Sequence, residues 1–149
     1  MDRLWIGTDD FDPGREISAL SAGRPEVGAV ASFVGLVRGE GEDVRAMTLE
    51  HYPGMTEKQI ASLIADARQR WRLDAVTVLH RIGRLLPGDR IVFVGVASRH
   101  RGDALAACEF VIDWLKSKAP FWKLEEATGG DRWVGTRESD QIRAEKWQK

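Results

Sequence analysis

Lys116 and Lys123 are the residues whose types and spacing best suit chemistry, because they stand on either side of Ala119–Pro120. Proline disfavours helical geometry at the residue before it, so a helix is expected to end here and a strand to begin. That bend can bring both ammonium groups toward one place. Neighbouring lysines lower each other's pKa, and a neutral lysine can act as a base or nucleophile. Alternatively, Lys116 only complements the C-terminal end of the helix dipole.

A second candidate is the run Arg99–His100–Arg101, between a predicted strand and the helix that follows it. Two fixed cations, a titratable imidazole and the free N–H groups of a helix N-terminus could together bind a phosphate. The same run would also fit a solvated loop with ordinary surface arginines.

Three further residues are candidates for ligand contacts. Phe33 and Arg38 lie near the end of a predicted long strand, where a phenyl ring beside a guanidinium would suit a flat heterocycle or an extended peptide. Arg137, in a polar tail, could bind an anion. Each residue also has a simpler interpretation, which is a core position for Phe33 and a solvated surface for the two arginines.

The histidines and the cysteine do not indicate metal or disulfide chemistry. The three histidines are scattered without the spacing of metal ligands, so no metal site is predicted. His51 and His80 fall within strand patterns, where a structural role is expected. Cys108 is the only cysteine and falls on the apolar stripe of a predicted helix, so packing is its expected role.

The composition fits one globular domain over residues 1–149. Lys and Arg number 22 against 23 Asp and Glu, a net charge of -1, which argues against generic binding of polyanions. Any anion site must then arise from local clustering of cations. The start of the chain lacks a signal-peptide pattern, and no apolar run approaches the roughly 20 residues of a membrane span. A cytoplasmic protein is expected.

Runs of β-branched and aromatic residues between turn residues predict the strands. Two long strands, residues 27–37 and 44–52, enclose a polar, glycine-containing loop at 38–43. Shorter strands are predicted over residues 4–7, 75–82, 91–97, 121–126 and 132–134. Strands and helices mixed irregularly at hairpin-length gaps predict an α+β fold with a mainly antiparallel sheet.

Two amphipathic helices are predicted in addition to a short helix over residues 15–22. The first begins near Thr56, which with Gln59 forms a capping box. Its apolar stripe is predicted at Ile60, Leu63, Ile64, Ala67 and Trp71. The second helix covers residues 103–118, and its buried stripe is predicted at Leu105, Cys108, Val111, Ile112 and Leu115. The tail from Glu138 on is polar, and no element is predicted there.

Seven segments along the chain combine into a specific pattern. They are GAVASFVGLVR (28–38), LEHYPGM (49–55), HRIG (80–83), PGD (87–89), VGVASRHR (94–101), KSKAPFWK (116–123) and DRWV (131–134). In this order, and over nearly the whole chain, they resemble the catalytic large subunit of molybdopterin synthase, the MoaE family.

The resemblance implies an α/β-hammerhead-like fold and a homodimer of this chain within a heterotetramer. A small ubiquitin-like (MoaD-like) sulfur-carrier subunit would dock at each end, and its C-terminal Gly-Gly tail, which carries a thiocarboxylate, would thread into a pocket. The implied activity is that of a sulfurtransferase, which donates sulfur twice to cyclic pyranopterin monophosphate and so builds the dithiolene of molybdopterin. No cofactor is implied, because the substrate and the partner's thiocarboxylate supply the reacting groups, and no nucleic acid or membrane is involved.

The resemblance also assigns residues to roles. Lys116 and Lys123 match the family's catalytic lysines. The substrate-binding positions match Phe33, Arg38, His100, Arg101 and Arg137, with some of them supplied across the dimer interface. Lys123 is expected to be the general acid or base, with Glu125 on the same strand face, and Lys116 is expected to contact the incoming carboxyl group. The reverse assignment of the two lysines fits the sequence equally well.

Two other functional classes remain open at this point. One is a non-catalytic module that binds a pterin phosphate or a ubiquitin-like protein, in which arginine would serve as well as lysine. The other is a single-stranded nucleic-acid binder, which six Trp and five Phe residues would suit. The near-neutral charge and the positions of Trp71 and Trp114 within predicted helices count against this second class.

Overall fold

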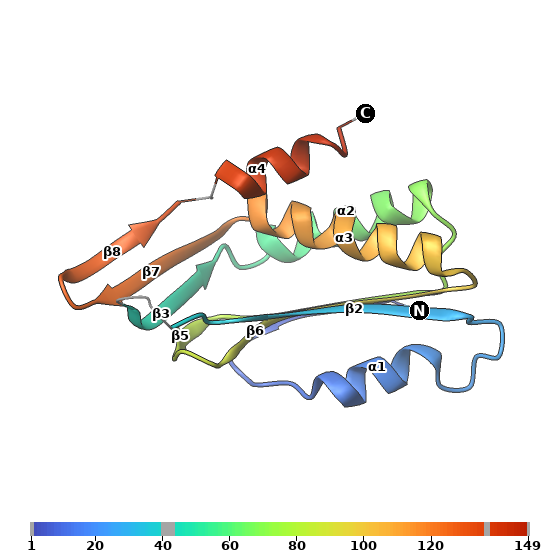
Figure 1. Cartoon of the computed structure of the whole chain (residues 1–149), viewed down its shortest axis with the longest axis horizontal. Helices are drawn as coiled ribbons and strands as arrows, with labels where there is room; N and C mark the ends of the chain where they lie inside the picture. Colours follow the sequence, from blue (N-terminus) through green and yellow to red (C-terminus); the bar gives the residue numbers. More distant parts are fainter. Residues whose placement is uncertain (1, 40–43, 136–137, 149) are drawn as a thin grey trace.

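The computed structural model describes residues 2–39, 44–135 and 138–148, which form two sheets with helices packed on them (Figure 1). The first sheet has the strand order β1-β4-β6-β2. Its strands are β1 (Asp2–Gly7), β2 (Ala29–Leu36), β4 (Ala75–Arg81) and β6 (Arg90–Ser98). β1 runs parallel to β4, whereas the β4–β6 and β6–β2 pairs are antiparallel.

The second sheet has the order β5-β3-β7-β8 and is antiparallel throughout. Its strands are β3 (Val44–His51), β5 (Gly83–Leu85), β7 (Phe121–Ala127) and β8 (Gly130–Val134). This sheet extends beyond one end of the first (Figure 1). The predicted α+β fold with mainly antiparallel sheet is confirmed. The short strand β5 was not predicted, because three residues carry too little pattern to separate a strand from a turn.

Helices cover both faces of the first sheet (Figure 1). α1 (Pro13–Ser21) lies on one face, and α2 (Met55–Arg70) and α3 (Arg101–Ser117) lie on the other. Strands β4 and β6 are therefore buried on both faces, which explains their near-continuous apolar sequences. Within the described residues, no helix combines the length and apolarity needed to cross a membrane.

The N-terminus of α2 differs from the predicted capping box. Gly54 is the N-cap residue, with a φ of 84° that glycine adopts without a steric penalty, and its N–H donates to the Glu57 carboxylate at 3.0 Å. Thr56 lies inside the helix, where its hydroxyl accepts from the Tyr52 N–H at 3.0 Å and donates to the Pro120 carbonyl at 3.2 Å. Thr56 thus joins the start of α2 to the start of β7. Four members of the predicted stripe are buried as expected: Ile60, Leu63, Ile64 and Ala67.

The buried face of α3 is rotated relative to the predicted stripe. Leu105 was predicted to be buried, but 61% of it is exposed. The helix lies against β2 and β6, and its buried face includes Ala104 and Ala107, which were not predicted, together with the predicted Val111. The two alanines have small side chains that allow close approach to the sheet. Cys108, Val111 and Leu115 are buried as predicted.

A fourth helix, α4 (Glu138–Glu145), packs on α3 and was not predicted. Its sequence has no apolar stripe, and several polar side chains attach it to α3. The buried carboxylate of Asp113 accepts from Arg143 Nε at 3.0 Å and, just beyond the helix, from Trp147 Nε1 at 2.8 Å. Glu109 forms a second pair with Arg143 at 2.7 Å. The sequence of this segment has no apolar period of the kind that predicts a helix.

Candidate functional site

Lys116 and Lys123 line the same cavities. Lys116 lies in the last turn of α3 and Lys123 on β7, and both side chains are half-buried. Together they line one cavity of about 250 Å³ and a second of about 310 Å³. The structure therefore brings the two lysines together, as the proline between them suggested.

The connection between α3 and β7 sets this arrangement. α3 ends at Ser117, and the Phe121 N–H donates to the Ala119 carbonyl at 2.8 Å, which makes a tight turn around Pro120. β7 then pairs with β3, and Lys123 stands opposite Leu49. Because the turn is short and held on both sides, the end of the helix and the start of the strand face one another across the cavity.

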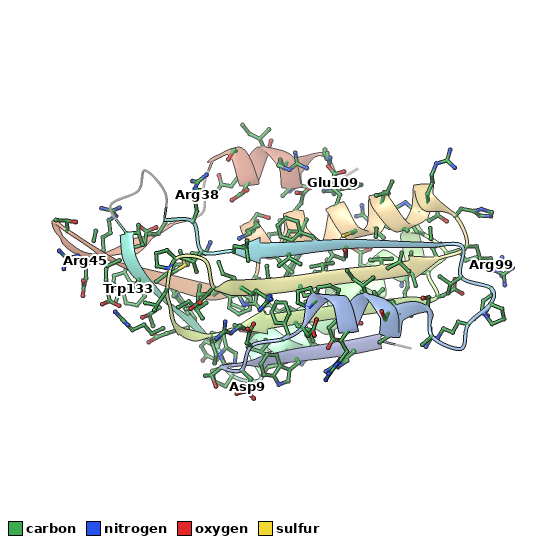
Figure 2. The ribbon with its side chains drawn as sticks, turned by 60° about the horizontal axis from the view of Figure 1, so that its bottom comes forward. Asp9, Arg38, Arg45, Arg99, Glu109 and Trp133 are labelled. Atoms are coloured by element: carbon green, nitrogen blue, oxygen red, sulfur yellow. The ribbon has the colours of Figure 1, made fainter. Side chains whose placement is uncertain are left out.

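Two of the predicted ligand-binding residues line cavities that Lys116 also lines. Arg38 lines the 310 Å³ cavity together with both lysines and Glu125. Phe33, 36% exposed, lines a neighbouring cavity of about 490 Å³ that Lys116 also lines. Figure 2 shows Arg38 just beyond the end of β2, where the second sheet begins.

Glu125 is already paired within the second sheet. Its carboxylate accepts a hydrogen bond from Arg132 Nη2 at 3.1 Å, across the β7–β8 pair in which the two residues are directly opposite. The side chain of Arg132 is 55% exposed. Any electrostatic influence of Glu125 on Lys123 is therefore reduced by this arginine.

His100 and Arg101 lie far from the lysines within one chain. His100 is the N-cap residue of α3 and Arg101 its first residue, whereas Lys116 lies in the last turn. At ~1.5 Å of rise per residue, Arg101 and Lys116 are roughly 22 Å apart along the helix. In Figure 2, Arg99, the residue before His100, lies at one end of the molecule, away from Arg38. The fifth predicted binding residue, Arg137, lies outside the described residues.

Comparison with known proteins identifies the family. Residues 6–118 match the family model described as MoaE protein. The molybdopterin synthase catalytic subunit of Ralstonia nicotianae is 56% identical over 149 residues, covering 99% of this chain and 85% of that protein. The chain belongs to the MoaE family. The subunit of the same name from Salmonella typhimurium is 54% identical over 147 residues, 97% of each chain. The resemblance recognised from the seven ordered segments is thus confirmed.

Solved structures agree with this membership in the MoaE family. The MoaE protein from Burkholderia ambifaria has a TM-score of 0.84 and 51% identity, over 99% of this chain and 98% of that chain. A complex of subunits 1 and 2 of molybdopterin-converting factor from Helicobacter pylori shares the fold, with a TM-score of 0.71, 20% identity and coverage of 92% and 90%.

Cys108 of this MoaE chain has the environment of a packing residue. It is 7% exposed, and its thiol lies 3.9 Å from the Val94 carbonyl. Burial, with the nearby charge of Glu109, raises the pKa of the thiol to about 12. A thiol in this state is a poor nucleophile and a poor sulfur carrier. Among the described residues, no group of three or more His, Cys, Asp or Glu side chains is arranged to hold a metal ion.

Sequence analysis missed several residues at the site. His80, for which a structural role is predicted, lines the 250 Å³ cavity with both lysines. Ser139 and Asp140 of α4 line the 310 Å³ cavity. The α4 pair was missed because α4 itself was not predicted. His80 was missed because the strand pattern gives the face of a residue but not what packs on that face.

Proposed function

We propose that the chain is the catalytic subunit of a molybdopterin synthase. This sulfurtransferase moves sulfur from the C-terminal thiocarboxylate of a small ubiquitin-like subunit to cyclic pyranopterin monophosphate, forming the dithiolene of molybdopterin. Two relatives above 50% identity over nearly the whole chain bear the name of that subunit. The structural observation that carries the proposal is that Lys116 and Lys123 line the same two cavities, one of them together with Arg38.

The charges of the site suit the two proposed ligands. The substrate phosphate and the partner's thiocarboxylate are both anions, so one region of the surface must gather cations. The chain as a whole has a net charge of only -1, but the lysines and Arg38 place three cations on the wall of one cavity, against the two carboxylates of Glu125 and Asp140. Fixed cations in a partly enclosed cavity also stabilise the negative charge that develops as sulfur adds and oxygen leaves.

We assign different roles to the two lysines. Lys123 would be the general acid or base, and Lys116 would contact the terminal carboxyl group of the partner's tail. The substrate and the partner carry all of the reacting groups, so the reaction as proposed uses no cofactor. Phe33 would supply an aromatic wall near Lys116, in the cavity that the two residues share.

The remaining binding residues would come from a second copy of the chain. Because Arg101 lies roughly 22 Å along α3 from Lys116, one chain cannot place both on one small ligand. A homodimer in which the start of one α3 approaches the end of the other would bring His100 and Arg101 to the lysines. A small MoaD-like subunit with a C-terminal Gly-Gly tail would then complete the heterotetramer.

The test is reconstitution from purified components. The chain would be mixed with cyclic pyranopterin monophosphate and a small ubiquitin-like protein that ends in a Gly-Gly thiocarboxylate, and dithiolene product would be measured. Product is expected from the wild-type chain. Binding of both ligands without any product would indicate a non-catalytic binding module.

Substitution of the lysines tests their roles in the same assay. We expect Lys123→Ala to lower the rate about 10²- to 10⁴-fold, the usual contribution of a general acid or base. Lys123→Arg should also be impaired, because a guanidinium keeps the charge but stays protonated near neutral pH and so cannot act as a base. Lys118→Ala is the matched control, since Lys118 is two residues from Lys116 but lines a different cavity. Full activity of Lys123→Arg would refute the proton-transfer role.

A further inference from the structure

His80 is held in one orientation at the wall of the 250 Å³ cavity. It lies on β4 with 7% of its surface exposed. Its ring stacks on Phe121 with centroids 3.8 Å apart and an angle of 14° between the planes. Its Nδ1 lies 2.8 Å from the Arg81 carbonyl oxygen. One ring face and one ring nitrogen therefore have fixed partners.

These contacts decide which ring nitrogen carries the proton. A carbonyl oxygen only accepts hydrogen bonds, so Nδ1 must be the N–H donor. The pKa of the imidazole is lowered to about 3, mainly by burial and also by the charges of Lys116 and Lys123, against the opposing effect of the hydrogen bond to Arg81. The ring is then neutral near pH 7, which leaves Nε2 unprotonated and an acceptor. Nε2 makes no hydrogen bond to any of the described residues.

The other polar side chains of this cavity are donors. Of the described residues that line it, the polar side chains besides His80 are Lys116, Lys123 and Trp122. Lysines in their charged form and an indole N–H donate hydrogen bonds and accept none, and the rest of the lining side chains are apolar. While both lysines are charged, Nε2 of His80 is thus the single side-chain acceptor on the part of the cavity wall that the structure describes.

We propose that Nε2 of His80 accepts a hydrogen bond from an N–H group of the ligand that occupies this cavity, which makes His80 a binding residue for the donor side of that ligand. The identity of the ligand rests on the proposed function. Two N–H sources fit the chemistry: the amide of the terminal glycine of the partner's tail and an N–H of the pterin. Either group loses water on entering the cavity and needs an acceptor there.

Two variants of His80 distinguish the roles of its two ring nitrogens. In His80→Asn, the amide takes the place of Nδ1 and can still donate to the Arg81 carbonyl, but nothing replaces Nε2. In His80→Gln, the longer side chain places an amide oxygen near the Nε2 position. Dissociation constants would be measured for a peptide ending in Gly-Gly, for the same peptide with an N-methylated terminal glycine, and for cyclic pyranopterin monophosphate. Thermal unfolding of each variant would report any structural damage.

We expect His80→Asn to weaken the binding of one of the two ligands about 10- to 100-fold, because a buried N–H of that ligand is left without a partner. The dissociation constants of His80→Gln should stay within about 3-fold of those of wild type. If the peptide amide is the donor, N-methylation of the peptide should weaken its binding to wild type. It should weaken binding to His80→Asn little further, because that variant already lacks the acceptor. In wild-type protein labelled with ¹⁵N-histidine, the Nε2 resonance of His80 should shift on addition of the same ligand.

Equal effects of the Asn and Gln variants on both ligands, or an Nε2 resonance that neither ligand shifts, would overturn the assignment. The ¹⁵N measurement needs no substitution, so it decides the question even if a variant fails to fold. Sulfur transfer by wild type in the reconstituted assay separates the two proposals. If wild type turns over but the His80 variants and the His80 resonance show no effect on ligand binding, only this inference is rejected. If wild type binds neither ligand, the proposed function is rejected as well.

Discussion

At the scale of single residues, His80 makes the stability of the fold depend on pH. Burial, with the charges of Lys116 and Lys123, lowers the pKa of its imidazole from 6.5 to about 3. In the unfolded chain the imidazole titrates near its ordinary pKa of about 6.5. Between these two values the unfolded state binds the additional proton, so the free energy of unfolding falls as the pH falls from about 6.5 toward 3.

We expect this one residue to contribute a slope of up to about 1.4 kcal/mol per pH unit within that window. Urea unfolding of wild type and His80→Gln would be compared at several pH values between about 6.5 and 4. Carboxylates add to the slope in both proteins, so the difference between the two slopes isolates His80. Identical slopes would show that the histidine is not held neutral in the folded state.

The sequence predicts that two site residues lie together where a short stretch of chain forces them close to each other. Lys116 and Lys123 are seven residues apart around a proline, and the turn that brings them together is local. His80 meets them only because β4, α3 and β7 converge on one cavity. That meeting depends on how the two sheets are placed, which no short segment encodes. The large distance between Arg101 and Lys116 also follows from the sequence, since most of one predicted helix lies between the two residues.

At the scale of elements, Asp113 controls the position of α4. Its buried carboxylate accepts hydrogen bonds from Arg143 and Trp147, which flank the C-terminal end of that helix. Asp113→Ala would leave both donors without this partner, so we expect it to lower the free energy of unfolding by about 1–2 kcal/mol. We also expect faster amide hydrogen exchange over residues 138–148, because α4 buries little apolar surface of its own.

Glu109→Gln is the matched control for this prediction. Glu109 also pairs with Arg143, but its side chain is 39% exposed, and exposed ion pairs contribute at most about 1 kcal/mol. The control should keep α4 protected from exchange. If α4 stayed equally protected in Asp113→Ala, apolar contacts such as those of Trp147 with Trp71 and Phe110 would be the main support of the helix.

Elements with a strong apolar period could be predicted, and those held by polar contacts could not. The stripe of α2 and the buried strand β6 follow directly from their sequences. α4 has no such stripe, since its attachment to α3 is made by charged and polar side chains. The rotation of α3 that exposes Leu105 is a tertiary effect, because small alanines on the neighbouring face allow closer packing on the sheet.

At the scale of the whole molecule, α3 connects two distant groups of predicted site residues. Lys116 at its end faces the cavities between the two sheets, and His100 and Arg101 at its start lie at the far end of the first sheet (Figures 1 and 2). One chain thus contains both halves of the proposed site without joining them. A two-fold dimer in which each chain supplies one half to its partner would form two complete sites.

Mixed dimers test this arrangement directly. If each site combines lysines from one chain with His100 and Arg101 from the other, a dimer of Lys123→Ala with Arg101→Ala has one doubly damaged site and one intact site. Random pairing of the two chains makes half of the dimers mixed, so we expect about a quarter of the wild-type activity from two chains that are each nearly inactive alone. The two variants, carrying different affinity tags, would be co-expressed and assayed, and dimer formation would be checked by sedimentation. If each site lay within one chain, every site in the mixture would carry one lesion, and the activity would remain the average of the two single variants.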